Sequence, residues 1–261
     1  MRKSILKDIL ILVGASILIW GIFTIFPLIP DDTGMKVSIE QEEKFGKLIV
    51  DNIINNNPAF VKVKNPVLDS ELDIIMLRLV NGIYATDYDY HIIVIDSPVV
   101  NAAALPGGYI LVFTGLIKIT DKPEELAAII AHEIGHIEKR HVISRIIKEL
   151  GLSIIFSGDN MVLGEVFKYA TSTAFSRQQE QEADDYSLKL LEKSEIHPIV
   201  MASVFRKLKE KVGDYGDNFE ILSTHPNINS RIKSSLSYKL KKNFKSNPIN
   251  IDWENVKAAL N

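Results

Sequence analysis

The chain has 261 residues, of which 46% are hydrophobic and 24% charged, which suffices for one domain of about 200 residues with a buried core. Its formal net charge is −3, with 30 Lys and Arg against 33 Asp and Glu, so no basic excess indicates a nucleic-acid partner. The absence of cysteine excludes disulfides, thiolate metal ligands and a cysteine nucleophile.

The N-terminal region predicts a membrane anchor over residues 1–30. Residues 9–26 form an apolar stretch that follows basic residues and precedes an acidic pair. This stretch is about as long as the shortest helix that spans a bilayer, and the flanking charges keep the N-terminus in the cytoplasm. A cleaved signal peptide and a buried core helix are the alternatives. A cleaved signal peptide should have small residues at its cleavage site, but residues 26–30 contain Phe and Pro. A buried core helix agrees poorly with the length of the apolar stretch and with the charges on either side of it.

After a Pro- and Gly-containing linker, the sequence predicts two helices and then a sheet. The first helix starts at a capping box at Ser38 and runs to about Ile54, and the second covers about residues 70–80. Two β-branched, apolar stretches, 90–96 and 109–114, predict strands of an antiparallel sheet. An exposed edge of this sheet is able to pair with an extended peptide, and the alternative is a sheet that only covers the core. The small residues assigned to peptide binding are Asn101, Ala102, Ala103 and Ala104.

The motif H-E-x-x-H lies within an apolar helical run and consists of His132, Glu133 and His136. Residues four apart on a helix differ by about 40° around the axis, so both imidazoles leave the same face. Two neutral imidazoles are able to bind one Zn²⁺, and the glutamate then reaches a water on the metal. A chance match is the alternative, but polar groups in an otherwise buried helix need partners, which a metal supplies.

We expect this helix to begin near Asp121 and to continue to about Leu150. His141 then lies about 140° around the axis from His136, faces away from the metal and is structural. Residues 151–175 are apolar but contain charged side chains. A second membrane span is one interpretation, and a helical hairpin beside the site, in contact with the membrane surface or not, is the favoured one.

A catalytic zinc ion has a third protein ligand, and Glu180 is the best candidate. Glu180 and Asp184 share one face of a helix that follows Ser176, and Asp184 is placed to reach the free ring nitrogen of a zinc histidine. Glu182 points about 160° away and is expected to be solvated. A solvated acidic helix face explains the same residues, and the residues alone leave this choice open.

Four motifs together resemble the membrane-associated zinc metallopeptidases of the HtpX/BepA type, over about residues 38 to 235. They are the H-E-x-x-H motif, the E-x-E-A-D run that starts at Glu180, the Thr-His-Pro loop at His225, and residues 101–108. CAAX prenyl endopeptidases and the mitochondrial inner-membrane quality-control peptidase are distant relatives. The resemblance implies that Glu180 is the third ligand, that Asp184 supports a zinc histidine and that His225 lies near the zinc.

The fold class that we expect is α+β, mainly α. It combines a zincin-like helical domain, a small antiparallel sheet beside the H-E-x-x-H helix, and one N-terminal transmembrane helix. The anchor is assigned to residues 1–30, the peptidase domain to 31–240 and a tail to 241–261. HtpX-type proteins have several spans and this chain shows one, so it is more similar to the single-domain, extracytoplasmic branch.

The expected function is a zinc endopeptidase with one Zn²⁺ per chain. Glu133 is its general base, and His225 donates to the oxyanion, with Arg231 as the second candidate and otherwise an orienting residue. His225 as a gating fourth ligand, or as a plain loop residue, stays open. Unfolded or extended polypeptides from misfolded envelope proteins are the expected substrates, outside the cytoplasm. The alternatives are a zinc-bound chaperone-like holding module and a prenyl-protein-type peptidase, which needs several spans.

Overall fold

The computed structural model describes residues 13, 14, 16, 37–215 and 219–260. The chain divides into two compact units, residues 1–38 and 39–261, and the second carries all the features below. The predicted anchor over residues 1–30 lies outside the described residues except for Val13, Gly14 and Ser16. No helix among the described residues has the length and apolar character needed to cross a bilayer.

Helices dominate the described part of the chain, as predicted. They are α2 (Ile39–Asn56), α3 (Pro66–Val80), α4 (Thr114–Ile119), α5 (Pro123–Glu138), α6 (His141–Leu150), α7 (Asn160–Ser172), α8 (Arg177–Lys193), α9 (Ile199–Tyr215), α10 (Ile221–Thr224), α11 (Ile228–Ser237) and α12 (Trp253–Ala258), with 3₁₀ turns η1 (Pro106–Gly108) and η2 (Leu152–Phe156). The H-E-x-x-H motif lies in α5, which contacts α3, α6, α8, α9 and the sheet. Most of α5 is buried, including His132, Glu133 and His136, so these polar side chains need partners inside the protein.

A small mixed sheet packs beside α5. Its order is β1-β2-β4-β3, formed by β1 (Val61–Lys62), β2 (His91–Asp96), β4 (Tyr109–Phe113) and β3 (Ala102–Ala104). β1 pairs with β2 and β3 pairs with β4 in antiparallel fashion, but β2 and β4 are parallel. The expectation of an antiparallel sheet is therefore wrong for the central pair. The chain reverses twice after β2, and β4 inserts between β2 and β3, so β4 runs in the direction of β2.

The turn between β3 and β4 depends on two glycines. Gly107 and Gly108 have φ values of 75° and 88°, a region that side chains with a Cβ rarely adopt. The N–H of Leu105 donates to the carbonyl of Tyr109 over 2.8 Å and closes the turn. β3 thus becomes an edge strand of the sheet, next to α5.

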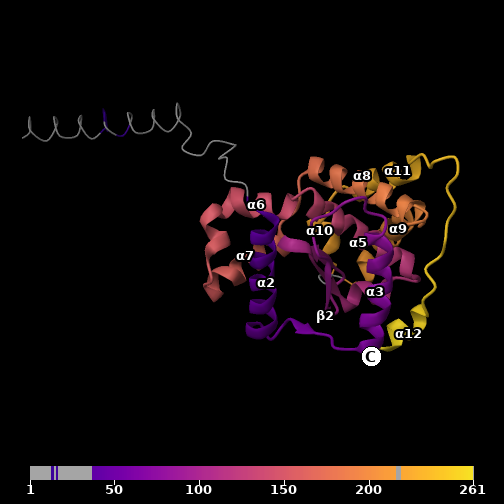
Figure 1. Ribbon diagram of the computed structural model, residues 1–261, viewed down its shortest axis with the longest axis horizontal. Helices are drawn as coiled ribbons and strands as arrows, with labels where there is room; N and C mark the ends of the chain where they lie inside the picture. The colour runs from indigo at the N-terminus through magenta and orange to yellow at the C-terminus, as the bar shows by residue number, and fades with distance from the viewer. Residues whose placement is uncertain (1–12, 15, 17–36, 216–218, 261) are drawn as a thin grey trace, which may run out of the picture. The chain divides into compact units, whose positions relative to one another are not determined.

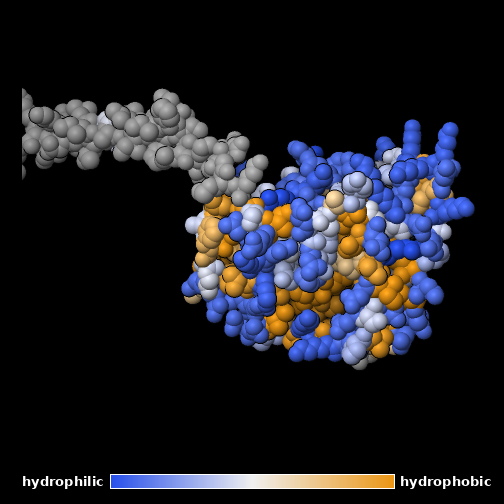
Figure 2. Space-filling view, in the orientation of Figure 1, coloured by the Kyte–Doolittle hydropathy of each residue, from blue (hydrophilic) through white to orange (hydrophobic). Residues whose placement is uncertain are grey.

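Two helices flank β2 on the near side in Figure 1, α2 and α3. Figure 2 shows a hollow with hydrophobic residues in it between these helices. Residues of both helices, among them Lys47 and Asp73, line a pocket together with β2. The predicted first helix agrees with α2. The second starts earlier than predicted, because Asn65 caps α3 by accepting hydrogen bonds from the N–H groups of Val67 and Leu68.

The predicted long metal helix is in fact two helices. α5 ends at Glu138 and α6 begins at His141, and Arg140 between them has a left-handed backbone with a φ of 54°. The Arg140 guanidinium pairs with the buried carboxylate of Glu42 on α2, with an N–O distance of 2.8 Å. A contact with a residue far away in the sequence therefore stabilises the corner that ends α5.

The described residues of the C-terminal tail pack on the domain. α12 contacts α3, and the indole N–H of Trp253 donates to the carbonyl of Thr120 over 3.1 Å. The N–H of Ile249 donates to Glu124, near the start of α5. The tail therefore braces the N-terminal end of the H-E-x-x-H helix.

Candidate active site

Four buried side chains converge on one point between α5, α8 and the loop after α10. One ligand atom from each of His132, His136, Glu180 and His225 lies within 4.8 Å of the others. α5 supplies the first two and α8 the third, while His225 follows α10 directly. The structure thus brings together the two motif histidines, the candidate third ligand and the loop histidine.

A close approach of α5 to α8 makes this convergence possible. At Gly135, between the motif residues, a Cβ would meet the carbonyl oxygen of Ala183 at 2.8 Å and its Cα at 3.0 Å. Glycine leaves this space free, so the backbones approach closely. Glu180, one turn before Ala183, is then within reach of the histidines.

The distances that join His132 to the other three groups are close to those around a tetrahedral metal ion. Zinc bonds of about 2.0–2.2 Å place neighbouring ligand atoms about 3.3–3.6 Å apart. The Nε2 atom of His132 lies 3.1 Å from Nε2 of His136, 3.3 Å from Nδ1 of His225 and 3.6 Å from Oε2 of Glu180. Nε2 of His136 is 3.6 Å from Oε1 of Glu180. Nitrogen and carboxylate donors of this kind are the ligands that zinc takes.

Electrostatics also favours a cation here. Burial lowers the pKa of His136 well below 6.5, which keeps this imidazole neutral with a free lone pair. Burial opposes a charge on Glu180, yet His225 and the other histidines more than offset this and hold its pKa below the usual range. Burial also disfavours charge on His225, but Glu180 and Glu133 raise its pKa above 6.5. Carboxylates that draw a proton onto a buried imidazole provide a fitting environment for a divalent ion.

Asp184 and Arg231 hold the opposite side of His132. Oδ1 of Asp184 lies 3.0 Å from Nδ1 of His132, so this imidazole turns its other nitrogen towards the cluster. Arg231, on α11, donates to both carboxylate oxygens of Asp184 over 2.7 and 3.0 Å. Its other nitrogen, Nη1, is 3.0 Å from Oε2 of Glu180. Nη2 of Arg231 also lies 3.0 Å from both ring nitrogens of His132. The guanidinium therefore contacts both carboxylates and the imidazole, a position that suits an orienting residue.

Glu133 lies at the edge of the cluster with one oxygen held and the other free. The N–H of Ala104 in β3 donates to Oε2 over 2.8 Å. Oε1 is buried and accepts no hydrogen bond from the described residues. Nε2 of His225 lies 3.6 Å from this oxygen. A buried carboxylate oxygen without a donor needs a partner, and a water in the cluster would supply one.

His141 does not face away from the cluster, contrary to the sequence-based expectation. Its Nδ1 atom is 3.0 Å from Nδ1 of His136, and its Nε2 atom is 3.0 Å from Oε2 of Glu182. The expected angle assumed one continuous helix, whereas the corner at Arg140 turns His141 back. The side chain of Glu182 is 41% exposed, which agrees with its expected position in solvent, although it also contacts His141.

The predicted peptide-binding strand lies next to the cluster but is covered. Ala102, Ala103 and Ala104 are buried, and α7 contacts β3. The N–H of Ile221 in α10 donates to the carbonyl of Val100, just before this strand. The strand that was expected to present an exposed edge therefore has α7 and α10 beside it in this structure.

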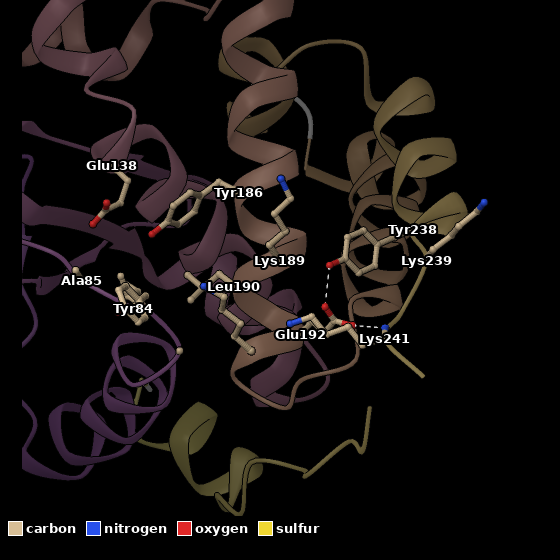
Figure 3. Close-up of a pocket in the computed structure, with 13 residues that line it drawn as sticks. Tyr84, Ala85, Glu138, Tyr186, Lys189, Leu190, Glu192, Tyr238, Lys239 and Lys241 are labelled. Atoms are coloured by element: carbon tan, nitrogen blue, oxygen red, sulfur yellow. Dashed lines mark hydrogen bonds between the residues drawn. The ribbon is translucent and has the colours of Figure 1, made fainter. Parts of the chain in front are cut away.

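A pocket of about 540 Å³ lies elsewhere, between the loop after α3, α8 and the end of α11. Figure 3 shows its tyrosine and lysine side chains, among them Tyr84, Tyr186 and Lys189. No residue of the four-residue cluster lines this pocket. The candidate active site is therefore identified by the four converging metal-binding side chains and not by the size of a cavity.

Residues 66–239, from the start of α3 to just beyond α11, match the model of Peptidase family M48. The chain belongs to this family. The predicted family resemblance is thus confirmed, and the matched M48 region contains every candidate site residue. A metal is implied for M48 members, and the buried cluster described above fits it.

Named relatives agree with the M48 assignment. Mitochondrial metalloendopeptidase OMA1 of Arabidopsis thaliana is 36% identical over 150 residues, 55% of this chain and 30% of that protein. Beta-barrel assembly-enhancing protease of Escherichia coli K12 is 27% identical over 217 residues, 76% of this chain and 44% of that protein. Metalloprotease LoiP of the same bacterium is 30% identical over 183 residues, which cover 66% of this chain and 70% of LoiP. The chain spans less than half the length of the first two.

Proposed function

We propose that this chain is a zinc-dependent endopeptidase that cleaves unfolded or extended polypeptides. The observation that carries the proposal is the buried convergence of His132, His136 and Glu180 beside the partly free carboxylate of Glu133. Three protein ligands with a neighbouring general base are the parts that a zinc hydrolase requires. One ion per chain follows from the single such cluster within the described residues.

His132, His136 and Glu180 would hold the zinc ion. When bound, zinc supplies Lewis-acid chemistry, which polarises the scissile carbonyl and lowers the pKa of water at the site towards about 7. Asp184 orients His132 from behind, and Arg231 keeps Asp184 in place. These supporting contacts make the ligand geometry rigid before any substrate binds.

Glu133 would act as the general base and then as the acid. Its Oε2 atom is tied to Ala104, so the carboxylate has a fixed orientation and its Oε1 atom remains available to accept a proton from water. The same oxygen then delivers the proton to the leaving amine. Such a base contributes about 10²–10⁴-fold to the rate.

His225 is proposed to stabilise the oxyanion that forms as the carbonyl is attacked. Its imidazole ring lies in the cluster beside Glu133, with Nε2 3.6 Å from Oε1 of that carboxylate, and an imidazole N–H is a donor of the kind that stabilises such an oxyanion. Its Nδ1 atom lies 3.3 Å from Nε2 of His132, a spacing that also fits a fourth ligand in a resting state. Removal of the His225 side chain distinguishes the two roles, because only the loss of an oxyanion donor slows cleavage.

Peptide substrates would bind along β3. This strand is at the edge of the sheet, and an extended peptide adds to an edge by main-chain hydrogen bonds. Alanine side chains at positions 102, 103 and 104 leave room for a second backbone. Because these residues and the cluster are buried, α7 and the α10 loop must move before a polypeptide reaches Glu133.

Degradation of misfolded membrane and envelope proteins is the proposed role. The relatives named as a mitochondrial metalloendopeptidase and as a beta-barrel assembly-enhancing protease support quality control of this kind. The charge pattern around residues 9–26 supports a membrane anchor with the catalytic domain outside the cytoplasm. A reporter fused after Asn261 tests this topology, and activity confined to the cytoplasm would refute it.

Proteolysis of an unfolded model protein tests the proposed activity. Wild type should cleave it and should contain one zinc ion, while Glu133→Gln should lose cleavage and keep the zinc. A chelator should abolish wild-type cleavage, and added zinc should restore it. Glu165→Gln, at an exposed position on α7, is the matched control and should cleave normally. A purified wild type without zinc would refute the proposal.

A zinc-bound holding module with little proteolysis is the alternative, and membership of a peptidase family with relatives named as proteases does not favour it. The same experiment separates the two candidates. A holder binds the unfolded protein equally well as wild type and as Glu133→Gln, and neither form cleaves it.

A further inference from the structure

The zinc histidine His136 has a polar partner behind it that the mechanism above does not use. Its Nε2 atom faces the cluster, and its Nδ1 atom lies 3.0 Å from Nδ1 of His141. His136 is fully buried and His141 is 5% exposed. Because water cannot readily substitute for either partner, this contact decides how the His136 ring is held.

Hydrogen-bond chemistry fixes the direction of this contact. A metal-binding imidazole offers its Nε2 lone pair, so the neutral ring of His136 carries its proton on Nδ1. That N–H donates, and Nδ1 of His141 accepts. The proton of His141 is then on Nε2, which lies 3.0 Å from Oε2 of Glu182. The chain of donors therefore runs from His136 through His141 to a carboxylate.

Both ends of this chain are anchored. Gln178, one turn earlier on α8, donates to Oε1 of Glu182 over 2.8 Å, which leaves Oε2 for His141. At the other end, the left-handed corner at Arg140 places His141 behind His136, and Glu42 holds that corner. The three residues of the chain thus come from three helices, α5, α6 and α8, and each is held by its own element.

The arrangement parallels the support of the other zinc histidine. Nδ1 of His132 meets the carboxylate of Asp184 directly at 3.0 Å, whereas His136 reaches a carboxylate through an intervening imidazole. Partners of this kind fix the tautomer of a ligand histidine, and their loss typically weakens metal binding 10–100-fold.

We propose that His141 and Glu182 are positioning residues that orient the His136 ring and so set the zinc affinity of the site. This inference rests on the proposed function, because it requires that zinc is the ion bound. His141 makes no contact with substrate and acts through His136. Glu182 acts in turn through His141, which predicts that their effects are coupled.

Zinc dissociation constants, measured by competition with a chromogenic chelator, test the inference. His141→Phe keeps the ring volume and removes the acceptor, and should weaken zinc binding about 10–100-fold. His141→Gln should restore most of the affinity, because its amide accepts from His136 and donates to Glu182. Glu182→Ala should weaken binding several-fold, while Asp185→Ala, at the exposed neighbouring position on α8, should not change it.

The double variant of His141→Phe with Glu182→Ala distinguishes positioning from a merely structural role. We expect it to bind zinc as weakly as His141→Phe alone, because Glu182 has no effect once His141 is lost. Independent losses that multiply would overturn the inference, and so would dissociation constants of His141→Phe and Glu182→Ala that lie within twofold of wild type. If His141→Phe does not fold, the comparison of Glu182→Ala with Asp185→Ala still decides it. A wild type that binds no zinc refutes the proposed function itself, and equal affinities in wild type and variants refute this inference alone.

Discussion

The main-chain N–H of Ala104 donates to Oε2 of Glu133 over 2.8 Å, and this bond joins the edge strand to the H-E-x-x-H helix. The proposed base is therefore oriented by the strand along which a peptide would lie. If a peptide adds to β3 as proposed, the backbone of this strand would set the position of the scissile carbonyl relative to the base.

Ala104→Pro should remove this bond and lower kcat about 100-fold, because a small displacement of a catalytic group has an effect of that size. Proline is tolerated on an edge strand where its nitrogen faces away from the sheet, as that of Ala104 does. Zinc content should stay at one per chain. Ala104→Gly keeps the N–H and is the control, and equal rates for the two variants would contradict the role of the bond.

His225→Ala should lower kcat by about 10²–10³-fold if the ring stabilises the oxyanion, while the zinc content stays unchanged. Steady-state cleavage of the unfolded model protein measures this. His197→Ala, in the turn before α9 and outside the cluster, is the control. If His225→Ala cleaves faster than wild type, His225 would instead be a fourth ligand that inhibits the resting site.

The acid stability of the metal-free protein should depend on Asp184. Burial raises the pKa of this carboxyl, but Arg231 and His132 more than offset it, so the folded pKa lies below the ordinary 3.8. The unfolded state then binds more protons in acid, and the stabilisation present above pH 3.8 is lost as the pH falls through the folded pKa. Urea unfolding at a series of pH values should show that the free energy of unfolding falls less steeply with decreasing pH in Asp184→Asn than in wild type. Asp185→Asn should retain the wild-type slope, and identical slopes for all three would contradict the prediction.

Gly135→Ala should destabilise the metal-free protein by about 1–3 kcal/mol, because the new Cβ would crowd the backbone of Ala183. Gly164→Ala, inside α7, meets nothing within 4 Å and should stabilise by about 0.5–1 kcal/mol through helix propensity. Thermal unfolding of both variants with chelator present separates this effect from zinc binding. A neutral Gly135→Ala would show that α5 and α8 have room to separate.

The sequence predicts the proposed metal ligands more accurately than it predicts the residues that pack behind them. His132, Glu133 and His136 follow from helical spacing, a local property, and Glu180 followed from residue chemistry together with the family pattern. His141 was misplaced because its position depends on Arg140, whose left-handed backbone is held by Glu42. No local pattern contains that contact.

The sheet shows the same division between local and distant interactions. The β-branched stretches correctly predicted β2 and β4, because strand propensity is carried by neighbouring residues. The parallel pairing of His91 with Tyr109 depends on the short strand β3, whose three alanines have no strand-like pattern. The covering of β3 by α7 and α10 is likewise a tertiary contact that alternation and spacing do not encode.

The burial of every proposed reactive group has a consequence for how such an enzyme would be controlled. Glu133 is 1% exposed and His136 is fully buried, so the observed rate would be the intrinsic rate multiplied by the fraction of molecules in an opened form. If about 1% of the population were open, kcat/KM would fall about 100-fold with no change in the chemistry. Looser packing of α7 or α10 would then raise proteolysis while it lowers the melting temperature. The packing contacts of α7 and α10 would therefore determine both the melting temperature and the rate of proteolysis, and a substitution that raises one would lower the other.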